Sequence, residues 1–115
     1  MPLKKSAMNP RRTAPKGLST AAKDWWKRLV SQYELDDDAG RLLLETAMQA
    51  FDRMRECQAI IERDGPMVLD RFSQRKAHPL LPAERDARAQ MLAALKALNL
   101  DTEPPHAQPG RPAGR

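Results

Sequence analysis

The chain has 115 residues, a formal net charge of +5 and a single cysteine, Cys57. This length allows one domain at most, and a lone cysteine excludes a disulfide framework. No apolar run approaches the roughly 20 residues that span a bilayer, and the N-terminus lacks the apolar region of a signal peptide. We therefore expect a reduced, cytoplasmic protein with no membrane partner.

The two ends of the chain differ in composition from the middle. Residues 1–17 contain five cations and no acid, and residues 101–115 contain four prolines and only alanine as an apolar side chain. Neither segment can bury enough apolar surface to offset the cost of ordering it. We predict a disordered basic arm at 1–17, a folded helical domain at 18–100 and a disordered Pro/Gly-rich tail at 101–115.

The net positive charge resides in the basic arm. Within 18–100, four lysines and nine arginines balance 13 acidic residues, and the tail is neutral as well. A flexible cationic segment suits sequence-independent attraction to DNA phosphates, because counterion release drives binding without a fixed geometry. A solubilising leader is the alternative. The cations of the arm are Lys4, Lys5, Arg11, Arg12 and Lys16.

The first predicted helix begins at Ser19 or Thr20, either of which can cap it, and runs to about Glu34. Its apolar residues recur at spacings of three and four, which predicts one wide apolar stripe. We interpret Trp25 and Trp26 in that stripe as core or interface anchors in preference to base-stacking platforms.

The second predicted helix opens at the acidic run 36–38 and ends near Asp64, before Gly65 and Pro66. Its apolar residues form a heptad-like seam that includes Gln58. A helix this long has apolar area to spare in a domain of 83 residues, so we predict self-association, with Gln58 able to set its register. The predicted oligomer interface comprises Trp25, Trp26, Leu44, Met48, Phe51, Met54 and Ile61.

A short connector and a third helix complete the predicted domain. Residues 67–69 are β-prone, which favours a small irregular hairpin or an extended connector. The third helix is predicted to start at Pro82 and to end at Asn99. Its predicted stripe comprises Ala87, Met91, Leu92, Leu95 and Leu98. The predicted fold class is all-α, with a long central helix in a helical hairpin.

Signs of enzymatic chemistry are few. The sequence lacks phosphate-binding, zinc-protease and nucleophile-elbow motifs, and adjacent aspartates at 36–38 diverge too much to hold a metal. His78 could act in acid–base catalysis with Glu84 or Asp86, but we favour a role in buttressing the start of the third helix. We therefore predict a protein that is not an enzyme and has no cofactor or metal.

The connector also supplies the second group of candidate DNA contacts. Arg71, Arg75 and Lys76 lie within 12 residues that read DRFSQRKAHPLL, with Arg85 and Arg88 nearby on the third helix. Cations in a loop can bind phosphates without reading the base sequence. A solvated polar loop is the alternative.

Four pieces in order resemble the small subunit of tailed-phage terminases, in the family that includes the cohesive-end packaging phages. They read LSTAAKDWWKRLVSQYELDDDAGRLLLETAMQAFDR, IIERDG, DRFSQRKAHP and ERDARAQMLAALKALNL, and together they cover roughly residues 17–100. The sequence departs from the family pattern after Phe72, where Ser73-Gln74 replaces a usual Gly-Gln pair.

The resemblance implies a non-enzymatic protein that assembles into a homo-oligomeric ring and binds viral double-stranded DNA. Such a ring initiates packaging and delivers DNA to the large terminase subunit, which carries the ATPase and nuclease, in the host cytoplasm. The alternative is a small dimeric helical DNA-binding regulator or antitoxin, which the mass in solution would distinguish from a ring.

Overall fold

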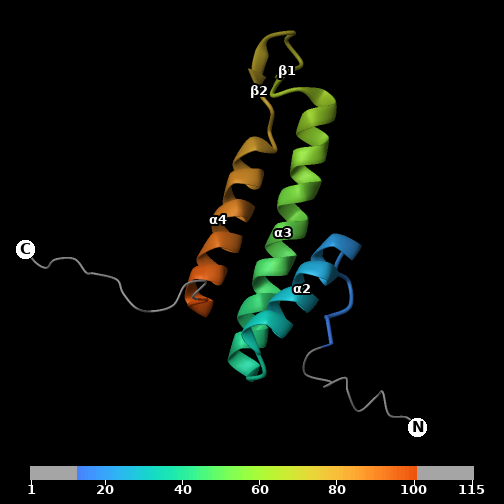
Figure 1. Cartoon of the computed structure of the whole chain (residues 1–115). Coiled ribbons are helices and arrows are strands. Elements are labelled where there is room, and N and C mark those ends of the chain that lie inside the picture. Colours follow the sequence, from blue (N-terminus) through green and yellow to red (C-terminus); the bar gives the residue numbers. More distant parts are fainter. Residues whose placement is uncertain (1–12, 101–115) are drawn as a thin grey trace, which may run out of the picture.

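The computed structural model of the chain describes residues 13–100, which form three helices and one small antiparallel sheet (Figure 1). The elements follow the order α2 (Thr20–Tyr33), α3 (Asp38–Asp64), β1 (Met67–Leu69), β2 (Arg75–Ala77) and α4 (Leu81–Leu98). The prediction of three helices with a short hairpin before the last one is confirmed. The predicted disorder of the ends concerns mainly residues 1–12 and 101–115, which lie outside the described residues.

Side-chain caps fix the starts of the first two helices. The Ser19 hydroxyl accepts a hydrogen bond from the Ala22 N–H at 3.1 Å, and the Asp37 carboxylate accepts one from the Gly40 N–H at 2.9 Å. Each bond satisfies a donor that the helix itself leaves unpaired. Gly65 ends α3 with a φ of 87°, a conformation that glycine adopts without strain.

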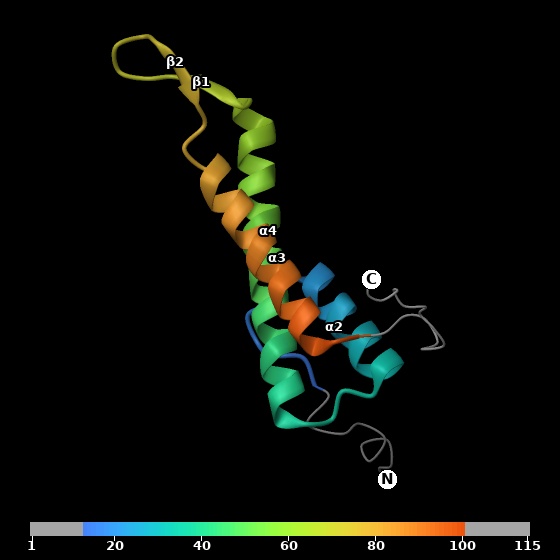
Figure 2. The same ribbon diagram turned by 90° about the vertical axis from the view of Figure 1, so that its left-hand side faces the viewer.

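Helices α3 and α4 lie antiparallel side by side and form the predicted helical hairpin (Figures 1 and 2). Ala87 and Ala94 are buried on α4, where small side chains allow the two helices to approach closely. Leu92 was wrongly placed in the apolar stripe, because 56% of its surface is exposed. It lies two residues before the buried Ala94 and therefore on another face of the helix.

The core lies at the end of the helical hairpin where α2 packs against the N-terminal half of α3 (Figure 1). Three helices bury a common apolar cluster there, and their largest fully buried side chains are Trp26, Leu44 and Val30. The cluster comprises Leu18, Ala22, Trp26, Val30, Leu44, Ala47, Met48 and Ala94.

The opposite end of the molecule is thinner. There the C-terminal half of α3 and the N-terminal half of α4 lie beside each other without α2, and the sheet projects beyond both helices (Figure 2). The two strands pair with Met67 opposite Ala77 and Leu69 opposite Arg75. We refer to residues 67–77 as the β-hairpin.

Candidate functional site

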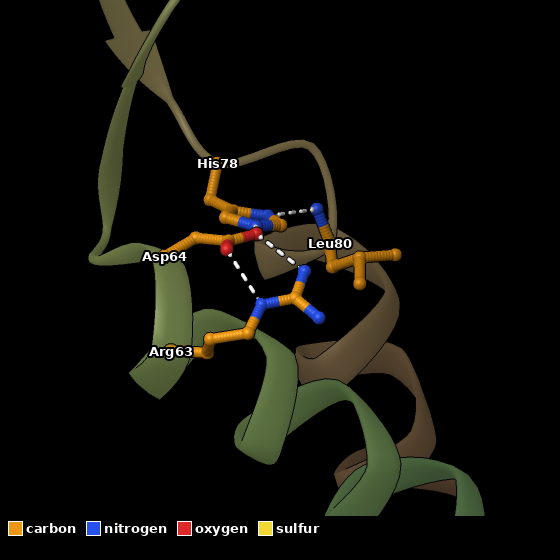
Figure 3. A network of polar contacts seen from close by, with 4 residues as sticks. All are labelled: Arg63, Asp64, His78 and Leu80. Carbon is orange, nitrogen blue, oxygen red and sulfur yellow. Dashed lines mark hydrogen bonds and ion pairs between the residues drawn. The ribbon is translucent and has the colours of Figure 1, made fainter.

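The base of the β-hairpin is held by His78, which connects the end of α3 to the start of α4 (Figure 3). The imidazole is only 5% exposed. Its Nδ1 accepts the Leu80 N–H at 3.0 Å, and its Nε2 lies 2.9 Å from Oδ2 of Asp64. Because Nδ1 accepts a hydrogen bond, the neutral ring carries its proton on Nε2 and donates it to Asp64.

Asp64 is the acidic centre of this joint. Arg63 contacts the same carboxylate with Nε at 2.8 Å and Nη2 at 3.1 Å (Figure 3). Hydrogen bonds from Arg63 and then from His78 lower the pKa of Asp64 from 3.8 to about 2. Asp64 is therefore ionised at neutral pH, as an acceptor for both side chains. We call Asp64, His78 and Leu80 the interhelical joint.

The structure gives His78 a structural role. Its ring is buried and both of its nitrogens are engaged, so the predicted buttressing of the third helix is confirmed. Glu84, considered as a catalytic partner, instead accepts hydrogen bonds from Gln58 at 2.9 Å and Arg88 at 3.0 Å. Asp64 was not among the predicted partners of His78, although two residues flanking the connector of a helical hairpin must lie near each other.

The turn of the β-hairpin is organised by Asp70, which was not among the predicted site residues. Its carboxylate accepts the backbone N–H groups of Phe72 at 2.8 Å and Gln74 at 2.9 Å. The bond from Gln74, that from Phe72 and the charge of Lys76 lower the pKa of Asp70. An aspartate that bonds the backbone two residues on is a common turn signal, so this role was readable in principle.

The β-hairpin combines exposed apolar and cationic side chains. Leu69 is 65% exposed and Phe72 is 70% exposed, and Arg71 lies over the Phe72 ring with its guanidinium carbon 5.3 Å from the centroid. The strand register places Leu69 and Arg75 on one face, with Lys76 on the other. The three predicted cations Arg71, Arg75 and Lys76 therefore share one projecting element, and all three are exposed.

The cations of the basic arm are mostly beyond the described part of the chain. Lys4, Lys5, Arg11 and Arg12 lie outside the described residues. Lys16 is described and exposed, close to the start of α2.

Four residues of the predicted oligomer interface are buried within a single chain. Trp26, Leu44 and Met48 are at most 3% exposed, and Met54 is 8% exposed. Trp26, Leu44 and Met48 belong to the apolar cluster to which α2, α3 and α4 of the same chain contribute. The core of the single chain accounts for their apolar spacing, so they are left out of the interface proposed below.

The other interface candidates keep accessible surface. Trp25 is 43% exposed, with the Arg28 guanidinium carbon 5.0 Å from its ring centroid, and Phe51 and Ile61 are partly buried. Gln58, expected to set an oligomer register, is instead bonded to Glu84 of its own chain.

Among residues 13–100, no three His, Cys, Asp or Glu side chains gather where they could hold a metal ion. No helix in the same range is long and apolar enough to cross a membrane.

The described residues form a small helical protein whose projecting β-hairpin presents charged and apolar side chains together. A family model described as "Phage terminase, small subunit" matches residues 22–104, a range that includes almost all of α2 and every later element. The chain therefore belongs to the phage terminase small subunit family and has a role in phage packaging. No curated protein and no solved structure matches the chain significantly.

Proposed function

We propose that the protein binds viral double-stranded DNA as a homo-oligomeric ring, starts genome packaging, and recruits and regulates the large ATPase-nuclease subunit in the host cytoplasm. The observation that carries this proposal is the match to the small-subunit family, since it spans the helical hairpin, the interhelical joint and the β-hairpin together. The distribution of charge supports the binding of DNA, and the exposed apolar side chains support the assembly of several copies.

For the DNA step, we propose the basic arm as the main phosphate contact. The five cations Lys4, Lys5, Arg11, Arg12 and Lys16 account for the whole formal net charge, because the charges of 18–115 cancel. Counterion release from DNA favours such a segment without requiring a fixed fold. We propose weaker, additional phosphate contacts from the three cations of the β-hairpin, Arg71, Arg75 and Lys76. The β-hairpin also exposes apolar side chains, which phosphate binding does not require.

For the assembly step, the accessible apolar residues provide the surface. Trp25 in α2 and Phe51 and Ile61 in α3 remain in the proposed interface, joined by Phe72 of the β-hairpin. Large apolar side chains that stay exposed in one chain gain free energy when a second chain removes them from water. Recruitment of the large subunit is proposed from the family membership alone.

The DNA step is tested by measuring affinity for double-stranded DNA over a series of salt concentrations. The test variant replaces the five arm cations by glutamine, which preserves chain length. If each of the five cations contacts one phosphate, the slope of log affinity against log salt should fall in magnitude by about 4.5. The control replaces the exposed Lys23, Lys27, Arg53 and Lys96 of the helices by glutamine and should change the slope little. An unchanged slope in the arm variant would refute the arm as the contact.

Native mass spectrometry of the full chain tests the assembly step. A single closed species of more than two copies is the expected result. A stable dimer over the whole concentration range would contradict the ring and would favour a dimeric regulator.

A further inference from the structure

Three large apolar side chains of the β-hairpin remain exposed in the single chain. Met67, Leu69 and Phe72 are 44%, 65% and 70% exposed. Three cations and one carboxylate give residues 67–77 a formal net charge of +2. A protein partner for this element must therefore offer an apolar surface with acidic residues around it.

A groove with these properties lies on the same chain, between the first turn of α2 and the outer face of α3. Its volume is about 700 Å³, enough to admit several side chains. Phe51 and Ala59 contribute apolar lining. Three acids and one arginine of α3 line it as well and give it a formal net charge of −2: Asp52, Glu56, Glu62 and Arg55.

Two of these charged groups are already engaged. Asp52 accepts hydrogen bonds from the Ser19 N–H at 2.8 Å and from the Ser19 hydroxyl at 2.5 Å. Arg55 lies over the Phe51 ring, with its guanidinium carbon 5.5 Å from the centroid. Glu56 and Glu62 are exposed and form no ion pair with another residue of 13–100. They are the acids available to a partner.

The β-hairpin of a chain does not occupy its own groove. It projects beyond the end of α3, whereas the first turn of α2 lies beside the middle of α3 (Figures 1 and 2). The interhelical joint fixes its base through Asp64 and His78, which keeps it pointing away from the helices (Figure 3). Only the groove of another copy is available to it.

We infer that the β-hairpin of one copy docks into the α2–α3 groove of the next copy. Phe72 and Leu69 then pack against Phe51 and Ala59, and Arg71 and Arg75 approach Glu56 and Glu62 of the neighbour. In the assembled ring, Lys76 on the other face of the β-hairpin is then the one of its three cations that stays available to DNA. The inference rests on the proposed self-assembly and names the surfaces that produce it. Because the two surfaces differ, the contact is head-to-tail, which closes into a ring when the rotation between copies allows it.

The test uses charge reversal on each surface of the full chain. One variant combines Arg71→Glu with Arg75→Glu, and the other combines Glu56→Arg with Glu62→Arg. Native mass spectrometry should show loss of the assembly in each, because like charges then face each other across the contact. The chain with all four substitutions should assemble again, since the opposite charges are restored with their signs exchanged.

Two controls separate assembly from folding and from total charge. All four residues are exposed, so far-UV circular dichroism should show unchanged helix content in every variant. The combination of Arg85→Glu with Lys96→Glu removes the same charge from α4, outside both surfaces, and should leave the assembly intact.

The variant Phe72→Ser should raise the concentration of half-dissociation roughly tenfold, because a buried phenylalanine is lost from the contact.

The outcomes distinguish this inference from the proposed function. If the hairpin reversal lowers affinity for DNA or for the large subunit but leaves the mass of the assembly unchanged, the docking inference is overturned and the ring stands. Failure of the four-substitution chain to assemble would also overturn it. A wild-type chain that never exceeds a dimer would refute the ring itself.

Discussion

Removing the His78 side chain should weaken the folded state measurably without removing a functional group. The variant His78→Ala loses the bond to the Leu80 N–H, worth about 1 kcal/mol, and the contacts of a buried ring, worth about 1 to 2 kcal/mol. We therefore expect the free energy of unfolding to fall by about 2 to 3 kcal/mol. For a domain of this size that corresponds to a loss of roughly 10 °C or more in Tm.

Two conservative variants separate the two contacts of the imidazole. In His78→Asn, the amide oxygen can replace Nδ1 as acceptor for the Leu80 N–H, but nothing reaches Asp64. In His78→Gln, the longer amide can replace Nε2 as donor to Asp64 but is poorly placed for Leu80. Since Asp64 is partly exposed and keeps its bonds from Arg63, we expect the asparagine variant to be the more stable of the two.

Urea denaturation followed by circular dichroism measures these differences. All variants must be compared at one protein concentration, because self-association adds to the apparent stability of the fold. If the free energy of unfolding of His78→Ala lies within about 0.5 kcal/mol of that of the wild type, the interhelical joint does not stabilise the fold. A loss of DNA binding with stability unchanged would instead assign His78 a direct functional role.

Three further predictions concern other positions. Ser73 has a φ of 62°, so Ser73→Gly should stabilise the β-hairpin by up to about 1 kcal/mol, seen as slower hydrogen exchange of its amides. The pKa of Asp64 is lowered to about 2, so its contribution to stability is complete above about pH 4 and is lost as the pH falls toward 2. Urea denaturation at a series of pH values should show the free energy of unfolding of the wild type approaching that of Asp64→Asn over that range. A difference between the two free energies that does not change with pH would contradict the role of Asp64. Trp26→Ala should lower the free energy of unfolding by about 3 to 5 kcal/mol, whereas Trp25→Ala should lower it by less than about 1 kcal/mol. Equal losses would show that both side chains are core residues.

The helix boundaries were readable from the sequence because local signals determine them. Ser19 and Asp37 cap helices through bonds to residues three positions away, and Gly65 ends α3 at the predicted place. Such contacts depend on a few consecutive residues, so one sequence is enough to recognise them. The connector was harder to predict, since a strand of three residues carries little periodicity.

The contacts between distant segments were less predictable. The apolar seam of α3 was attributed to a second copy, although α2 and α4 of the same chain cover Leu44 and Met48. Apolar spacing indicates that a face is buried but not which element buries it. Likewise, the sequence suggested nearby Glu84 or Asp86 as partners of His78, whereas the partner Asp64 lies 14 residues earlier, across the hairpin.

The interhelical joint also has a consequence for the geometry of an assembly. Helix α3 has 27 residues and is therefore about 40 Å long, with the β-hairpin beyond its far end. If the hairpin docks on a neighbour, its direction relative to α3 sets the angle between successive copies, and a full turn divided by that angle gives their number. His78 and Asp64 would then govern copy number from outside the contact, so substitutions there could yield closed rings of another size.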